Sequence, residues 1–242
     1  MKKKLIIGAP TANRDWIIRD WLTHIDNSFY HVSDLYDLEI ILVASDQDPS
    51  VKITDSFCKE YGYNFNFVYI DEPKSDDKRI WNIKRYERMV LLRNILLEEV
   101  RKLEPEYFLS LDTDILINPL QISYLLETIQ SHPAAAVGGK TFMTKTGVNS
   151  PSYGMFIKHE HSMGIRRKNN DGVLKVDVIM AIKLMNKLAY NVDYIVHSHG
   201  EDLGWSSECK KQGLQLYWDG RIASKHVMFQ SSLNELDKRV GF

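Results

Sequence analysis

Two aspartates, two residues apart, follow an apolar run in the middle of the sequence. The run covers residues 107–111, and Asp112 and Asp114 come directly after it. A short apolar run without alternation is typical of a parallel strand buried on both faces, and ligands bind beyond the carboxyl ends of such strands. Because residues i and i+2 of a strand point to the same side, both carboxylates can reach one hard cation such as Mg²⁺ or Mn²⁺. The pattern predicts a site for a metal ion and a phosphate group, although aspartates followed by Asn118-Pro119 are also typical of a turn.

A second acidic pair, Glu201 and Asp202, precedes a predicted helix. At the start of a helix, the Asp202 carboxylate could simply cap the free backbone N–H groups. At the mouth of a pocket it could instead serve as a general base, made more basic by its charged neighbour. The residues alone leave both interpretations open.

Histidines near this pair suggest a different chemistry. His197, His199 and Glu201 alternate along a predicted strand, so their side chains could share a face and bind zinc, as in a hydrolase. This is an alternative to the general-base interpretation of the same segment.

Composition limits the class of protein. The 242 residues are 44% hydrophobic and 26% charged, enough for one sizeable core, and we expect one domain. A formal net charge of -1 gives no strong nucleic-acid signal. Two cysteines are too few for a disulfide framework, and no segment approaches the roughly 20 apolar residues of a membrane helix. We therefore expect a cytoplasmic protein with at most peripheral membrane association.

The elements that must position the acids alternate along the first half. Apolar runs predict strands, and helical spacing with caps and glycine stops predicts helices. The predicted strands cover 4–9, 38–44, 65–70 and 107–111, and the predicted helices cover 13–25, 53–61 and 86–103. This alternation favours an α/β fold with a parallel sheet and helices on its faces.

The second half follows a different pattern. It contains predicted helices at 122–129 and from Gly200 to Gly213, and predicted strands at 134–139 and 194–196. Residues 138–172 are polar and basic, and we expect a mobile, irregular functional loop there.

Six short motifs, in this order, resemble those of metal-dependent nucleotide-sugar glycosyltransferases of the GT-A fold, family 2-like in their D-x-D and E-D motifs. They are Ala9-Pro-Thr-Ala-Asn-Arg14, Ser45-Asp46, Leu92-Arg-Asn94, Leu111-Asp-Thr-Asp114, Gly200-Glu-Asp202 and Lys225-His226. The resemblance implies a single GT-A-like (Rossmann-like) α/β domain over residues 1–242, with a mostly parallel central sheet flanked by helices. Residues 1–118 would form the nucleotide-sugar-binding half and residues 119–242 the acceptor-binding half. The glycines that many members carry before the acidic pair are missing from 176–180.

The resemblance also implies roles for individual residues. Asp114 would bind the divalent cation, Mn²⁺ or Mg²⁺, while Asp112 would approach the ribose and the hydrated metal, and His226 would complete the metal's coordination. Asp202 would be the acceptor-side base, with Glu201 as its partner. Nucleotide contacts would come from Thr11, Arg14, Asp46 and Arg93. Arg93 could equally be a solvent-facing helix residue.

These roles imply a hexosyltransferase-type enzyme that moves a sugar from a nucleotide-sugar donor, with UDP-sugar favoured, to an acceptor hydroxyl. The acceptor could be a glycan, a lipid-linked sugar, a protein or a small molecule, and the anomeric carbon would invert. Two alternatives remain: a haloacid-dehalogenase-like phosphohydrolase with Asp112 as nucleophile, and a catalytically silent nucleotide-sugar-binding module.

Overall fold

The computed structural model describes most of the chain. The described residues are 2–45, 47–71, 82–145, 148–152, 155–156, 172–227 and 229–233, and for 143–145, 148–152 and 155–156 only the backbone is described.

The first half forms four parallel strands connected by helices. The strands are β1 (Lys3–Pro10), β2 (Tyr36–Ala44), β3 (Asn64–Tyr69) and β4 (Tyr107–Leu111), in the spatial order β3-β2-β1-β4. The connecting helices are α1 (Ile18–Phe29), α2 (Pro49–Tyr61) and α3 (Ile83–Leu103), with the short η1 (Tyr30–Val32) after α1. All seven longer elements predicted for this half are present.

The predicted start of the first helix is wrong. Asn13 does not cap α1, because it adopts a left-handed conformation with φ of 54° and the helix begins only at Ile18. Polar asparagine tolerates this conformation better than most residues do. The residues between Pro10 and the helix therefore form a turn beyond the end of β1.

The second half extends the same sheet. β11 (Ile182–Met185) pairs antiparallel with both β4 and β6 (Ala136–Lys145), and β12 (Leu216–His226) runs parallel to β6. The remaining strands are β5 (Ile115–Leu116), β7 (Val148–Ser152), β9 (Val173–Val176) and a separate pair formed by β8 (Met155–Phe156) and β10 (Val178–Ile179). The remaining helices are α4 (Gln121–Ser131), α5 (Lys187–Tyr190), α6 (Glu201–Lys211) and η2 (Gln230–Ser232).

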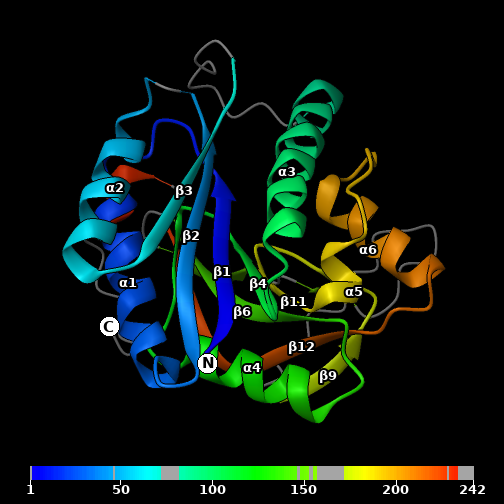
Figure 1. Cartoon of the computed structure of the whole chain (residues 1–242). Helices are drawn as coiled ribbons and strands as arrows, with labels where there is room; N and C mark the ends of the chain where they lie inside the picture. The colour runs from blue at the N-terminus through cyan, green and yellow to red at the C-terminus, as the bar shows by residue number, and fades with distance from the viewer. Residues whose placement is uncertain are drawn as a thin grey trace.

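The sheet separates two layers of helices (Figure 1). On β1, Leu5 and Ile7 pack in the core shared with α1, α2 and α4, whereas Ile6 packs in the core shared with α3, α5 and α6. Strands covered on both faces need apolar residues at every position, which explains the continuous apolar runs. The predicted fold class, a single α/β domain with a central sheet flanked by helices, is confirmed.

Two predictions for the second half are wrong. No strand forms at 194–196, where the described chain is irregular. Residues 138–145 and 148–152 are not an irregular loop, because β6 and β7 pair antiparallel there. Residues 157–171 of the predicted mobile loop lie outside the described residues.

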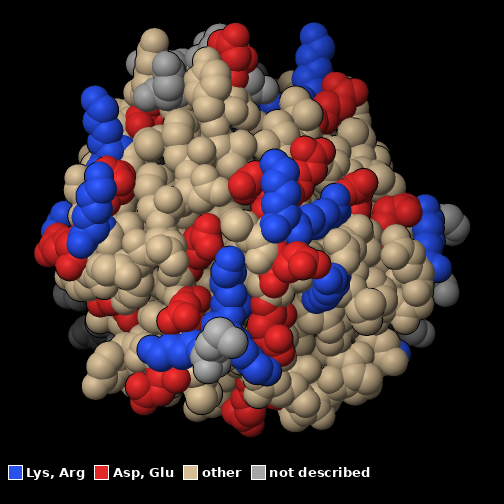
Figure 2. All heavy atoms as spheres, in the orientation of Figure 1, with Lys and Arg blue, Asp and Glu red and all other residues tan. Residues whose placement is uncertain are grey.

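The surface carries both signs of charge. Figure 2 shows basic and acidic side chains interspersed on one face, and many of them form pairs, such as Lys3 with Glu106 at 2.8 Å and Lys187 with Glu104 at 2.6 Å. This distribution agrees with the net charge of -1. Among the described residues, no helix is both long and apolar enough to cross a membrane.

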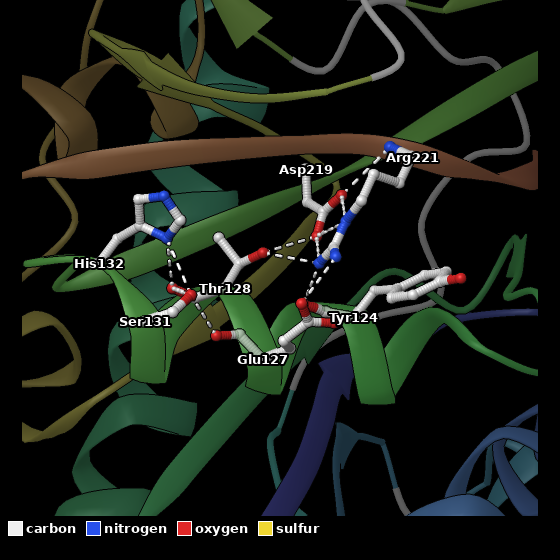
Figure 3. Close-up of polar contacts among 7 residues, drawn as sticks. All are labelled: Tyr124, Glu127, Thr128, Ser131, His132, Asp219 and Arg221. Atoms are coloured by element: carbon white, nitrogen blue, oxygen red, sulfur yellow. Dashed lines mark hydrogen bonds and ion pairs between the residues drawn. The ribbon is translucent and has the colours of Figure 1, made fainter.

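A polar cluster ties α4 to β12 (Figure 3). The Arg221 guanidinium donates to Asp219 Oδ2 at 2.8 Å, to Thr128 Oγ1 at 3.0 Å and to Glu127 Oε1 at 3.0 Å, and it stacks 4.4 Å from the ring centre of Tyr124. Asp219 is fully buried, and the register of β12 against β6 shifts directly after it. The cluster therefore satisfies a buried charge where the strand pairing is interrupted.

Candidate active site

The two aspartates of the predicted metal motif lie in the turn between β4 and β5. The Asp112 N–H donates to the Ala181 carbonyl at 3.3 Å, and the Ile115 N–H donates to the Asp112 carbonyl at 3.0 Å. The Trp21 indole N–H donates to the same Asp112 carbonyl at 3.1 Å. The residues thus form a turn, and the turn lies at the carboxyl end of a buried strand, where α/β folds bind ligands.

Asp114 contacts two other predicted site residues, Arg14 and His226. Its Oδ2 accepts a hydrogen bond from Arg14 Nη2 at 2.9 Å, and its Oδ1 lies 3.3 Å from Nε2 of His226. His226 is opposite Ile115 in the antiparallel pairing of β12 with β5, and Val227 donates its N–H to the Asp114 carbonyl at 2.7 Å. This pairing carries a histidine from near the C-terminal end of the sequence to the aspartate turn.

Arg93 of α3 joins the two acidic motifs. Its Nη2 donates to Asp112 Oδ1 at 2.8 Å, and its Nε lies 3.3 Å from Glu201 Oε1. Its Nη1 donates to Ser110 Oγ at 3.2 Å, so every guanidinium nitrogen has a protein partner. The Arg93 side chain is only 3% exposed, which excludes the solvent-facing alternative.

Neighbouring acidic groups keep the guanidinium of Arg93 protonated. Burial works against the charged form, but Asp112, Asp202, Tyr194 and Glu201 outweigh it and raise the pKa of Arg93 well above its ordinary value. Arg93 is therefore a permanent cation between the acids.

Glu201 and Asp202 occupy the first turn of α6, and each is 7% exposed. The N-cap is Gly200, which has φ of 115° and offers no side chain, so Asp202 does not cap the helix. Glycine reaches such a φ at little cost. The capping interpretation of Asp202 is therefore wrong, and its carboxylate contacts a different group.

That group is the ammonium of Lys183 on β11. Its Nζ forms an ion pair with Asp202 Oδ1, and the Lys183 side chain has no exposed surface. The rings of Tyr194 and Trp205 lie 5.3 Å and 5.9 Å from Nζ, within the range of cation–π attraction.

The neighbouring carboxyls have opposite pKa shifts. Burial tends to raise the pKa of Asp202, but Lys183 and Arg93 outweigh it and hold that pKa below its usual range. Burial, aided by the adjacent Asp202 charge, raises the pKa of Glu201 despite Arg93. Environments that separate the pKa values of two nearby carboxyls are typical of acid–base sites.

A strained residue connects the motifs through the backbone. Ala181 has φ of 57°, a conformation that costs a non-glycine residue about 1–3 kcal/mol. Its carbonyl accepts the Asp112 N–H, and its backbone also hydrogen-bonds the Asp202 carboxylate. The strain is located where the two motifs meet.

The predicted nucleoside contacts are positioned by the ends of β1 and β2. The Thr11 N–H donates to the Val43 carbonyl at 2.9 Å, while its buried Oγ1 finds no partner in the described part of the chain. The Asn13 N–H donates to Asp48 Oδ2 at 2.9 Å, and Asp48 also caps α2. Asp46 lies outside the described residues.

Asp114 and His226 are the residues that could hold a metal. A carboxylate oxygen and an imidazole nitrogen 3.3 Å apart suit Mn²⁺, because carboxylates bind Mg²⁺ and Mn²⁺ whereas imidazole favours transition ions. Among the residues that the structure describes, no three His, Cys, Asp or Glu side chains converge, so Asp114 and His226 would leave coordination positions for other ligands such as substrate or water. Zinc at His197 and His199 is also disfavoured, because no third ligand converges on them among the described residues and the strand predicted at 194–196 does not form.

Lys183 and Asp48 lie in this region but were not predicted from the sequence. Lys183 is the one charged residue in the apolar run Ala181-Ile-Lys-Leu-Met185, and a lone lysine in a buried strand is a signal that could have identified it. Asp48 precedes Pro49 and looks like an ordinary helix cap.

Comparisons with known proteins show the fold. No family model and no curated protein matches the sequence. The structure is similar to TarS of S. aureus (residues 1–349) solved with UDP-GlcNAc, with a TM-score of 0.62 and 14% identity over 97% of this chain. It is also similar to the mannosyltransferase PcManGT of Pyrobaculum calidifontis solved with GDP-Man and Mn²⁺, with a TM-score of 0.60 and 12% identity over 93% of this chain. The chain spans 62% and 57% of the lengths of those two proteins.

Proposed function

We propose that this protein is a metal-dependent glycosyltransferase that moves a sugar from a nucleotide-sugar donor to an acceptor hydroxyl with inversion. The observation that carries the proposal is the bridge formed by Arg93, which contacts both Asp112 and Glu201. The bridge places the acidic pair of α6 beside the aspartate turn of β4. A donor phosphate site and a proton acceptor are thus neighbours, as transfer between two substrates requires.

The donor side uses Asp114 and His226 as metal ligands. A divalent cation held there would neutralise the charge that develops on the departing diphosphate. Arg14, which contacts Asp114 at 2.9 Å, is placed to add a second positive charge near the same phosphates. Mn²⁺ is favoured over Mg²⁺ because of the imidazole.

The acceptor side uses Asp202 as the base. The acceptor oxygen attacks the anomeric carbon while the bond from that carbon to the diphosphate oxygen breaks, and its electron pair leaves with the diphosphate. The hydroxyl proton passes to Asp202, which its surroundings keep ionised. Attack from the face opposite the leaving group inverts the anomeric carbon.

The donor is proposed to be a hexosyl nucleotide. The turn after β1, with Thr11 and Arg14, would bind the nucleoside end, so residues 1–118 would form the nucleotide-binding half and residues 119–242 the acceptor half. The unpartnered Thr11 Oγ1 is a candidate contact for a base or ribose. UDP is favoured, and the similar structures contain UDP-GlcNAc in one case and GDP-Man with Mn²⁺ in the other.

The direct test measures nucleotide binding by calorimetry. UDP, GDP, UDP-GlcNAc and GDP-Man are titrated with and without Mn²⁺ into the wild type, Asp114→Ala and the surface control Asp37→Asn. We expect one nucleoside diphosphate to bind only with Mn²⁺, and this binding to vanish in Asp114→Ala and persist in the control. Metal-independent binding, or binding that survives in Asp114→Ala, would contradict the proposal.

A second assay separates the remaining alternatives. Release of nucleoside diphosphate from the donor that binds indicates an active enzyme, whereas binding without release indicates a silent module. Hydrolysis of p-nitrophenyl phosphate that depends on Asp112 would instead favour the phosphohydrolase.

A further inference from the structure

The Lys183–Asp202 pair is unusual in its burial. Lys183 has no exposed surface, and Asp202 is 7% exposed. Removing an ammonium from water costs several kcal/mol unless a partner compensates. Among the described residues, the carboxylate of Asp202 forms this ion pair with Lys183.

Stability alone does not explain the pair. Replacing a buried ion pair by apolar side chains of similar volume is often neutral or stabilising. The strand around Lys183 is otherwise apolar, and Ile182 and Leu184 are both fully buried. A methionine or leucine would fit the pattern of the strand, so the lysine must be explained by what it does to Asp202.

Lys183 fixes one end of the Asp202 carboxylate. β11 is held between β4 and β6, with Lys183 opposite Ser110 on one side and Gly138 on the other. The aromatic rings of Tyr194 and Trp205 flank its ammonium. A lysine confined in this way has few rotamers, so it can hold a partner in one orientation.

We propose that Lys183 is a positioning residue for the transfer reaction: its ammonium holds Oδ1 of Asp202 and leaves Oδ2 to take the proton of the acceptor hydroxyl. This inference rests on the proposed function and assigns a role within the same site. Lys183 touches neither substrate in this scheme, and acts through Asp202.

Besides the Ala181 backbone, four titratable side chains influence the charge of Asp202. They are Lys183 on β11, Arg93 on α3, Glu201 on α6 and Tyr194 in the segment before α6. Arg93 is already bound to Asp112, Glu201 and Ser110, so Lys183 supplies the cation dedicated to Asp202. Removing Lys183 should therefore raise the pKa of Asp202.

The test compares Lys183→Met with Lys175→Met, an exposed lysine on β9. In Lys183→Met we expect kcat to fall at least tenfold, the donor KM to stay within twofold, and the acid limb of kcat/KM to move up by about 1–3 pH units. Lys175→Met should match the wild type. An unchanged kcat and acid limb in folded Lys183→Met would overturn the proposal.

Two further measurements do not depend on the activity of Lys183→Met. In the wild type, the ¹³C carboxyl resonance of Asp202, assigned by its loss in Asp202→Asn, should remain that of an ionised group down to about pH 4. Titration at or above the ordinary aspartate value would overturn the proposal.

If Lys183→Met does not fold, the double variant Lys183→Met/Asp202→Asn should fold, because it removes both charges, and failure of the double variant would count against the pairing.

Asp202→Asn separates this inference from the proposed function. If Asp202→Asn keeps wild-type turnover, then the base assignment itself fails, and the positioning role fails with it. If Asp202→Asn is inactive while Lys183→Met behaves as the wild type, only the role of Lys183 is wrong.

Discussion

Arginines neutralise both aspartates of the turn after β4. Arg14 contacts Asp114 and Arg93 contacts Asp112. The two arginines differ in what they can do next. Arg93 is buried and fully bonded, whereas Arg14 retains 19% exposure. In the proposed reaction, Arg14 would move from the carboxylate to a donor phosphate when a cation takes its place.

Asp202→Asn should abolish most transfer without removing donor binding. Asparagine keeps the size of the side chain but cannot take a proton, and a well-placed general base contributes roughly 10²- to 10⁴-fold to the rate. Steady-state turnover and calorimetric nucleotide binding, both measured well below the melting temperature, check this. Loss of donor binding together with turnover would indicate a role other than base.

Replacing Asp202 by its uncharged amide should lower the stability of the fold, whereas the same change at Glu201 should not. The pKa of Asp202 is lowered in the folded protein, so its ionised form stabilises the fold above about pH 4, and this contribution is lost as pH falls through the folded pKa. Asp202→Asn should therefore cost about 3–5 kcal/mol at pH 7, because it leaves Lys183 unpaired. Thermal unfolding of the wild type and of Asp202→Asn, measured at pH 7 and at steps down to about pH 2, follows the change.

For Glu201 the sign is reversed. Its raised pKa means that the ionised form opposes folding above that pKa, and that stability rises as pH falls through it. Glu201→Gln should consequently be at least as stable as the wild type at pH 8, and the difference should shrink toward pH 4. A melting temperature several degrees below the wild type at pH 8 would show that the contact with Arg93 dominates.

At the scale of elements, α6 is held unusually close to the segment before it. A Cβ added at Gly204 would lie 2.1 Å from the carbonyl oxygen of Ile195, which is backbone and cannot move aside easily. The close approach places the first turn of α6, with Glu201 and Asp202, against Arg93 and Lys183. The position of the acidic pair thus depends on a glycine that carries no chemistry.

Gly204→Ala should lower stability by up to about 2 kcal/mol. Alanine favours a helix by about 1 kcal/mol over glycine, but overpacking against backbone costs about 1–3 kcal/mol. Ser207→Ala, at a half-buried position of the same helix, is the matched control and should be neutral or slightly stabilising. Urea denaturation measures both, and a stabilised Gly204→Ala would show that the helix shifts freely.

At the scale of the whole molecule, one sheet forms the wall of both hydrophobic cores. Trp21 lies in the core on the α1 and α2 side, and Trp205 and Trp218 lie in the core on the α3 and α6 side. Residues of β1 alternate between the two cores. Disruption of the sheet would therefore expose both cores together.

Unfolding should therefore be a single cooperative transition. Tryptophan fluorescence, which reports on both cores, and far-ultraviolet circular dichroism should give coincident thermal curves. Replacing both Trp16 and Trp21, which contact the first core, by phenylalanine should leave a fluorescence transition, to which Trp205 and Trp218 of the second core contribute, at the same temperature as the dichroism of that variant. Separate transitions would show that the two cores unfold independently.

The sequence by itself determined the local features of this protein. Uninterrupted apolar runs require strands buried on both faces, which made β1, β2 and β4 recognisable. Asp112 and Asp114 were identifiable because their spacing and their place after a strand are local properties. β12 was not recognised, since Trp218-Asp-Gly-Arg-Ile mixes polar and apolar residues, and its strand depends on pairing with β6 and β5.

Only the tertiary structure decided how the candidate site is assembled. Arg93, Lys183 and Asp202 lie on three different elements, and α3, β11 and α6 bring them together beside the turn after β4. Ion pairing depends on distance in space, which periodicity along the chain does not encode. The packing of these elements therefore determined that Arg93 is buried, that Lys183 pairs with Asp202, and that two neighbouring carboxyls have opposite pKa shifts.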